Sequence, residues 1–202
     1  MNKLDVLFVH PNGAPIIYQE LSKTYSAIEP PIWAALLANN ARINGWSTRI
    51  IDCEAERLNA ADSAEAIVSY NPRLVAIVIY GQQPSASTQN MAGTSALLDE
   101  LNARKGDLKT VLIGLHPSAV SRQTLQDEDC DFVCQGEGIH TVNALLSINM
   151  NDNSELSKVP GLWYREEGKI VYTKPAPIVP QEDLATVLPG MAWDLLPMNK
   201  YR

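Results

Sequence analysis

Short apolar runs alternate with segments of helical periodicity over the first three quarters of this 202-residue chain. The clearest run, residues 74–80, is almost continuously apolar, which is typical of a strand buried on both faces of a parallel sheet. Further strands are predicted at residues 4–9, 47–52, 110–113 and 131–134, and helices at residues 30–44, 62–70, 88–104, 118–127 and 138–148. This (βα)5 pattern predicts an α/β fold of the flavodoxin-like (Rossmann-like) type, with a doubly wound five-stranded parallel sheet in the strand order 2-1-3-4-5.

The pattern changes after about residue 150. Residues 161–165 and 169–173 flank the tripeptide Glu166-Glu167-Gly168 and predict a β-hairpin. Residues 174–197 hold five prolines, which predicts an extended connector with little structure of its own. We therefore expect an α/β domain over residues 1–150, a β-hairpin extension over 151–174, and a linker over 175–202 that leads toward a further domain.

Composition limits the possible partners. The net charge is −7 and no run of Lys or Arg occurs, which argues against nucleic acid. The apolar runs are far too short to span a bilayer, and the N-terminus lacks the pattern of a signal peptide, so no membrane contact and a cytoplasmic location are expected. Three cysteines, an odd number, argue against a disulfide framework.

Two strands that are neighbours in sequence each end in a turn that contains glycine. The turns are Gly114-Leu115-His116-Pro117 and Gly136-Glu137-Gly138. In an open parallel sheet, ligands bind beyond the carboxyl ends of the strands, and glycine lets the backbone approach them closely. The two turns together predict a large flat ligand across this edge. The alternative is a pair of tight strand–helix turns, with Glu137 capping the helix that follows.

Two other strand ends carry candidate contacts. The turn after the first strand is His10-Pro11-Asn12-Gly13, and residues 14–29 behind it form a long connection of the kind that is usually functional. The loop after residues 74–80 is polar, and its candidate residues are Tyr80, Gly81, Gln82, Gln83, Pro84, Ser85, Ser87 and Thr88. Its hydroxyl groups can hydrogen-bond a ligand, or Ser85 or Ser87 can cap the next helix.

Several short sequence motifs occur together along the chain. They are the pair Pro30-Pro31 before a helix rich in Ala and Leu, the stretches 45–52, 114–119 and 131–138, and a tail with the stretches 159–162 and 192–197. In this order and spacing the chain resembles the N-terminal cobalamin (B12)-binding domain of B12-dependent radical SAM enzymes. The resemblance covers essentially the whole chain.

The resemblance implies that the turns and loops above hold cobalamin. It implies a base-off corrinoid, whose nucleotide tail lies beside the sheet, and methyl transfer from S-adenosylmethionine to a substrate in the parent protein. S-adenosylmethionine and a [4Fe–4S] cluster would then belong to a C-terminal radical SAM domain that is missing here. Cys130 and Cys134 lack a third cysteine at cluster spacing and are expected to be structural, so this chain alone is expected to be inactive.

Two roles are possible for His10. It is a candidate lower axial cobalt ligand, because His10 and Gly13 match the second half of the Asp-x-His-x-x-Gly motif of other B12 domains. Phe8, however, stands at the aspartate position, and a ligating histidine normally needs an acceptor that sets its tautomer. We therefore expect His10 to cap its own loop and not to bind cobalt.

Two other functions remain open at the level of sequence. One is a cofactor-free flavodoxin-like interaction or signalling module. The other is a flavin- or nucleotide-binding domain, although the turn at residues 10–13 is a poor phosphate cradle and no G-x-G-x-x-G motif follows the first strand.

Overall fold

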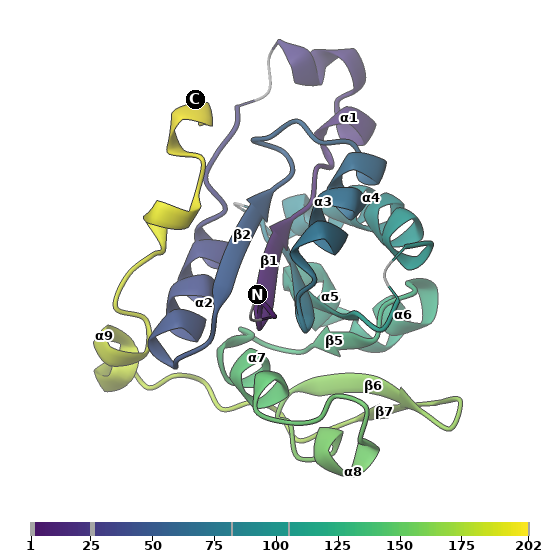
Figure 1. The fold of residues 1–202 in the computed structure, drawn as a ribbon, viewed down its shortest axis with the longest axis vertical. Helices are drawn as coiled ribbons and strands as arrows, with labels where there is room; N and C mark the ends of the chain where they lie inside the picture. Colours follow the sequence, from purple (N-terminus) through teal and green to yellow (C-terminus); the bar gives the residue numbers. More distant parts are fainter. Residues whose placement is uncertain (1–2, 25–26, 82, 105, 202) are drawn as a thin grey trace.

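The computed structural model describes residues 3–24, 27–81, 83–104 and 106–201, and its centre is one seven-stranded sheet (Figure 1). The strand order is β2-β1-β3-β4-β5-β6-β7. The five parallel strands are β1 (Val6–His10), β2 (Thr48–Asp52), β3 (Leu74–Ile79), β4 (Lys109–Gly114) and β5 (Phe132–Cys134). The flavodoxin-like order predicted from the alternation of strands and helices is therefore confirmed.

Helices cover both faces of the sheet. On one face lie α2 (Ile32–Ile43) and α7 (Ile139–Leu146), and on the other lie α3 (Ala60–Tyr70), α4 (Pro84–Asn102) and α6 (Ser121–Asp127) (Figure 1). Alternate residues of one strand serve the two layers: Phe8 packs in the α2 layer and Val9 in the α3–α4 layer. This two-sided burial explains why β1 and β3 read as continuous apolar runs.

Several expected boundaries were wrong. Helix α4 begins at Pro84 and not at residue 88, because proline suits a first helical turn. Helix α3 begins at Ala60 and not at residue 62, and it is capped by Asn59, whose side chain accepts from the amide of Asp62. The helix expected at residues 118–127 is two helices, α5 (Leu115–Ala119) and α6. The connection over residues 14–29 holds α1 (Ala14–Ile17) and the 3-10 helix η1 (Gln19–Lys23).

The hairpin is part of the sheet. Strand β6 (Leu162–Glu166) pairs antiparallel with β5, and β7 (Lys169–Tyr172) pairs antiparallel with β6. Tyr164 is only 2% exposed and lies in the α2–α7 layer, which includes the short α8 (Asn153–Leu156). Arg165 donates to the carbonyl of Cys130 at 2.7 Å, which ties the hairpin to the start of β5.

The C-terminal strap, residues 181–201, lies along α2 (Figure 1). It contains η2 (Gln181–Asp183), α9 (Leu184–Val187), η3 (Trp193–Leu195) and η4 (Met198–Lys200). The amide of Ala192 donates to the carbonyl of Ala35 at 3.1 Å, and the Tyr201 hydroxyl donates to Asp52 at 2.9 Å. The strap therefore runs to the carboxyl edge of the sheet. Among the described residues, none of the helices has the length and apolar character needed to cross a bilayer.

We expect Asn40→Ala to destabilise the fold. The Asn40 side chain is buried, donates to the carbonyl of Val187 in the strap at 2.7 Å, and accepts from Asn143 of α7 at 2.6 Å. Its loss leaves buried polar groups unpaired, at a cost of about 1–3 kcal/mol in urea denaturation. Asn39→Ala is the matched control, because Asn39 binds the strap from a more exposed position. Equal effects of the two substitutions would contradict this account.

Candidate functional site

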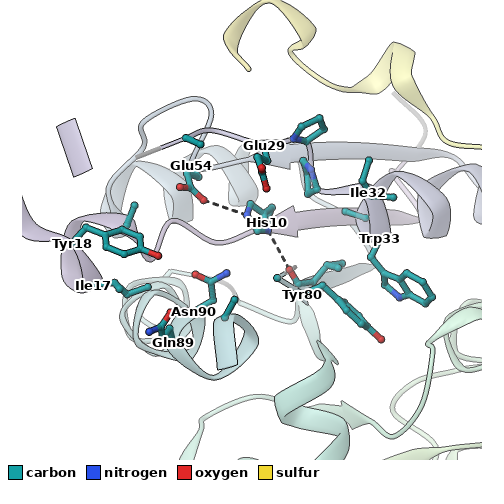
Figure 2. Close-up of a pocket in the computed structure, with 18 of the residues that line it drawn as sticks. His10, Ile17, Tyr18, Glu29, Ile32, Trp33, Glu54, Tyr80, Gln89 and Asn90 are labelled. Atoms are coloured by element: carbon teal, nitrogen blue, oxygen red, sulfur yellow. Dashed lines mark hydrogen bonds and ion pairs between the residues drawn. The ribbon is translucent and has the colours of Figure 1, made fainter. Parts of the chain in front are cut away.

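A cavity of about 720 Å³ lies beyond the carboxyl ends of β1 and β3. The strand order reverses between these two strands, and open α/β sheets bind ligands in the crevice at such a point. The lining comes from β1, β3, α1, η1, α2, α4 and the segments that connect them. It consists of His10, Ala14, Ile17, Tyr18, Leu21, Ala27, Glu29, Pro30, Pro31, Ile32, Trp33, Ala34, Glu54, Val78, Tyr80, Gly81, Ala86, Gln89 and Asn90. Most of these groups are apolar, and a few polar ones converge among them (Figure 2).

An aromatic pair forms one wall of the cavity. The ring of Trp33 on α2 packs against the ring of Tyr80 after β3 (Figure 2), with the ring centroids 4.8 Å apart. The Trp33 indole donates to the carbonyl of Glu137 at 3.1 Å. This bond joins the start of α2 to the turn before α7. Burial raises the pKa of Tyr80, so its hydroxyl stays neutral and can only share hydrogen bonds.

His10 lies at the base of the cavity with both ring nitrogens engaged. Its Nδ1 is 3.4 Å from the carbonyl oxygen of Val78, and its Nε2 is 3.5 Å from a carboxylate oxygen of Glu54 (Figure 2). The side chain is 9% exposed. The parallel register places Asp52 beside His10 on the neighbouring strand, which carries Glu54 close to the ring. The acceptor that the sequence did not show next to His10 therefore comes from other elements.

The surrounding charges favour the protonated form of His10. Burial alone would lower the pKa of this ring, but the hydrogen bond to Glu54 and the charges of Asp52 and Glu54 outweigh burial, so the pKa is raised. Asp52 is itself buried, and it accepts from the amide of Ala55 at 3.1 Å and from the Tyr201 hydroxyl.

The turn Pro11-Asn12-Gly13 does not line the cavity and instead contacts neighbouring elements of the fold. The Asn12 side chain donates to the carbonyl of Leu58 at 3.0 Å. Gly13 packs against α4, where a Cβ on Gly93 would lie 2.7 Å from the Gly13 Cα. This close approach fixes α1 beside the cavity. Gly93 carried no signal in the sequence, because nothing there says which backbone it meets.

The loop after β3 is shorter than expected. Gln83 is the N-cap position of α4 without a side-chain cap bond. Pro84, Ser85, Ser87 and Thr88 are helical, so the alternative in which Ser85 or Ser87 caps the helix is wrong. Ser87 is buried, donates to the carbonyl of Ile79, and accepts from the amide of His116 at 3.0 Å. The hydroxyl oxygen of Thr88 lies 3.1 Å from the Nδ1 of His116, within hydrogen-bond distance. These bonds join the ends of β3 and β4.

The glycines of the two predicted turns have steric reasons within the fold. A Cβ on Gly114 would lie 2.2 Å from the carbonyl oxygen of Ile79 on β3. Gly138 has φ +87°, and a Cβ there would lie 2.9 Å from the Ile113 side chain. Gly136 has φ +108° with open space around it, so its backbone conformation is the reason for glycine.

Of the residues predicted to contact a ligand, Tyr80 and Gly81 line the cavity, together with His10. Gln82 lies outside the described residues. The others lie in the turns after the strands or early in the helices that follow, and do not line this cavity: Pro11, Asn12, Gly13, Gln83, Pro84, Ser85, Ser87, Thr88, Gly114, Leu115, His116, Pro117, Gly136, Glu137 and Gly138. Sequence reasoning missed Glu54, Asn90 and Tyr18. Only the length of the connection over residues 14–29 pointed toward the α1 side of the cavity.

Comparison with known proteins identifies the fold family. The B12 binding domain family matches residues 21–146, well over half of the chain. The chain belongs to the B12-binding domain family. The resemblance to the cobalamin-binding domain of B12-dependent radical SAM enzymes is thereby confirmed.

Two curated relatives are longer than this B12-binding domain. An uncharacterized methyltransferase of Pyrococcus horikoshii, PH0819, is 29% identical over all of the chain and 41% of its own length. The anaerobic magnesium-protoporphyrin IX monomethyl ester cyclase of a Synechocystis strain is 28% identical over 85% of the chain and 33% of its own length. The chain thus spans less than half of either relative.

Solved structures share the fold at low identity. The radical S-adenosylmethionine methyltransferase TsrM of Kitasatospora setae superposes with a TM-score of 0.67 at 18% identity, covering 87% of this chain and 31% of its own. The cobalamin-dependent S-adenosylmethionine radical enzyme OxsB, with aqua-cobalamin bound, gives 0.65 at 16% identity, covering 96% and 25%.

Gly114→Ala tests the steric reading of the turn after β4. The added Cβ meets the backbone of β3, which cannot move without breaking the sheet, so we expect a loss of about 1–3 kcal/mol or more in the free energy of unfolding. Leu115→Ala is the control, because Leu115 is 38% exposed. A fully stable Gly114→Ala variant would contradict the close approach.

The His10–Glu54 pair predicts a pH-dependent stability. A histidine whose pKa is raised in the folded state stabilises fully below its unfolded pKa of about 6.5, and this contribution is lost as the pH rises through the folded value. We therefore expect the unfolding free energy of the wild type, relative to His10→Gln, to fall as the pH rises above about 6.5. A difference that does not change with pH above this value would contradict the ion pair.

Proposed function

We propose that this chain is the cobalamin-binding domain of a B12-dependent radical SAM protein and holds the corrinoid base-off, without His10 on cobalt. The observation that carries the proposal is the cavity at the reversal of strand order in a chain of the B12-binding domain family. The family supplies the class of ligand, and the cavity supplies a place at the edge where such folds bind ligands.

The residues at the cavity suit a wide ring with amide substituents. The lining includes residues with small or no side chains, which let a broad ligand come close to the sheet: Ala34, Gly81 and Ala86. The side-chain amides of Gln89 and Asn90 on α4 can donate to and accept from amide groups of a ligand. The volume of about 720 Å³ lies in the range of binding pockets for small molecules and cofactors.

Bound cobalamin supplies a cobalt centre that can carry a methyl group. The chain's own residues bind and orient the ring: α1 and the segment before α2 lie on one side of the cavity, and Gln89 and Asn90 lie on another. Trp33 and Tyr80 form an aromatic wall of the cavity, which the bond from Trp33 to Glu137 ties to the turn before α7. The two ring nitrogens of His10 face the acceptors Glu54 and Val78, so the ring would offer no free nitrogen to bound cobalt.

The role in a larger protein is part of the same proposal. Methyl transfer from S-adenosylmethionine, a [4Fe–4S] cluster and a C-terminal radical SAM domain are properties that we assign to the parent protein and not to this chain. Supporting this, Cys134 is fully buried, and burial raises the pKa of its thiol to about 11, which is unsuited to a cluster ligand. The relatives, which are more than twice as long as the region matched, leave room for such a domain.

A flavin or a nucleotide is less well matched by this cavity. Its described lining residues include Glu29 and Glu54 and neither Lys nor Arg, so a phosphate there would meet negative charge. A module without any ligand would not need an opening of this size at the sheet edge. Both alternatives remain outcomes of the experiment below.

The test is an anaerobic absorbance spectrum after incubation with hydroxocobalamin and desalting. We expect corrinoid bands in the wild type and, after reduction to Co(II), a base-off spectrum. Flavin bands in the purified protein, or no retained corrinoid, would overturn the proposal.

A matched pair of variants locates the corrinoid. Gln89→Trp places a large ring at the cavity from an exposed position on α4, and we expect at least a tenfold loss of affinity, which corresponds to about 1.4 kcal/mol. Gln123→Trp makes the same change at an exposed position on α6 and should bind normally. Equal affinities of the two variants would place the ligand elsewhere.

A further inference from the structure

We propose that Glu54 is a positioning residue that withholds His10 from cobalt by keeping both ring nitrogens of His10 protonated. The inference rests on the proposed function and names the residue that decides the coordination of the lower face. Glu54 lies two residues beyond β2, outside every motif that carried the family resemblance.

The geometry around the ring leaves no nitrogen free. Val78 offers a carbonyl oxygen to Nδ1 and Glu54 offers a carboxylate oxygen to Nε2, at 3.4 and 3.5 Å. Both partners can only accept, and a neutral imidazole has a single N–H. Only the imidazolium donates to both. A protonated nitrogen has no lone pair, so neither nitrogen can bind a metal.

The other charged groups near the ring act in the same direction. Asp52 lies beside His10 in the β1–β2 register and carries a carboxylate held by Ala55 and Tyr201. Glu29 lines the same cavity from the segment before α2. The titratable hydroxyls in the lining, Tyr18 and Tyr80, bring no positive charge, and the described lining residues include no other cation. The carboxylate of Glu54 forms an ion pair with the ring.

Removal of Glu54 converts His10 into a competent ligand. The remaining partner, the carbonyl of Val78, selects the tautomer with the proton on Nδ1. The lone pair of Nε2 is then free at the cavity. An Nδ1–H donated to a backbone carbonyl is the arrangement that metal-ligating histidines commonly have.

The first test uses the protein without corrinoid. Nitrogen-15 NMR of the His10 ring, assigned with His10→Gln, should show both nitrogens protonated at about pH 7 in the wild type. Glu54→Gln keeps the shape of the side chain and removes its charge, and should give a neutral ring protonated at Nδ1. Glu56→Ala is the control, because Glu56 lies on the same loop and pairs with Lys200. A neutral His10 in the wild type would overturn the inference.

The second test uses hydroxocobalamin reduced to Co(II) and electron paramagnetic resonance. The wild type and Glu56→Ala should show no splitting from a histidine nitrogen. Glu54→Ala should show splitting from one nitrogen, which changes when the protein is labelled with ¹⁵N-histidine and is lost in Glu54→Ala/His10→Gln. The isotope label separates His10 from the base of the cofactor itself.

The two failures are distinguishable. Retained corrinoid without histidine splitting in Glu54→Ala would overturn this inference and leave the proposed function standing. Corrinoid retained by none of the variants would overturn the proposed function, and the coordination argued here with it.

Discussion

The pairing of β1 with β3 is the constraint on which the rest of this structure depends. Because β2 lies on the far side of β1, the chain reverses its direction of winding at this pair, and helices leave it toward opposite faces. The crevice that results receives His10 from β1, Tyr80 from the end of β3, Trp33 from one helical layer and Asn90 from the other. The site is thus a consequence of strand order.

Close backbone contacts then set the shape of that crevice. Gly93 lets the turn after β1 rest on α4, and Gly114 lets β4 approach β3. The bond from Trp33 to Glu137 joins α2 to the turn before α7, and the strap holds α2 from its outer side. Glycines that first suggest a ligand can therefore serve the scaffold that positions it, which is the role the structure gives to Gly114 and Gly138.

More of the architecture than of the candidate site could be predicted from the sequence. Continuous apolar runs and helical periodicity were enough for five parallel strands in the right order, because burial on both faces leaves a strong one-dimensional signal. The merging of the hairpin with β5 left no such signal, since a hairpin reads the same whether its edge is paired or free. Glu54 was invisible for a similar reason: its relation to His10 exists only through the β1–β2 register. The sequence argument against His10 as a ligand rested on Phe8 and a missing acceptor, whereas the structure supplies an acceptor in Glu54.

The central claim is that a corrinoid lies over the crevice between β1 and β3 with His10 directed to Glu54. The most direct measurement is a crystal structure of the chain grown with hydroxocobalamin, with the cobalt located by its anomalous scattering. The account predicts a cobalt peak beyond the carboxyl ends of β1 and β3, with the Nε2 of His10 bonded to Glu54 and outside coordination distance. A cobalt peak over another part of the molecule, or a His10 nitrogen coordinated to the metal, would contradict it.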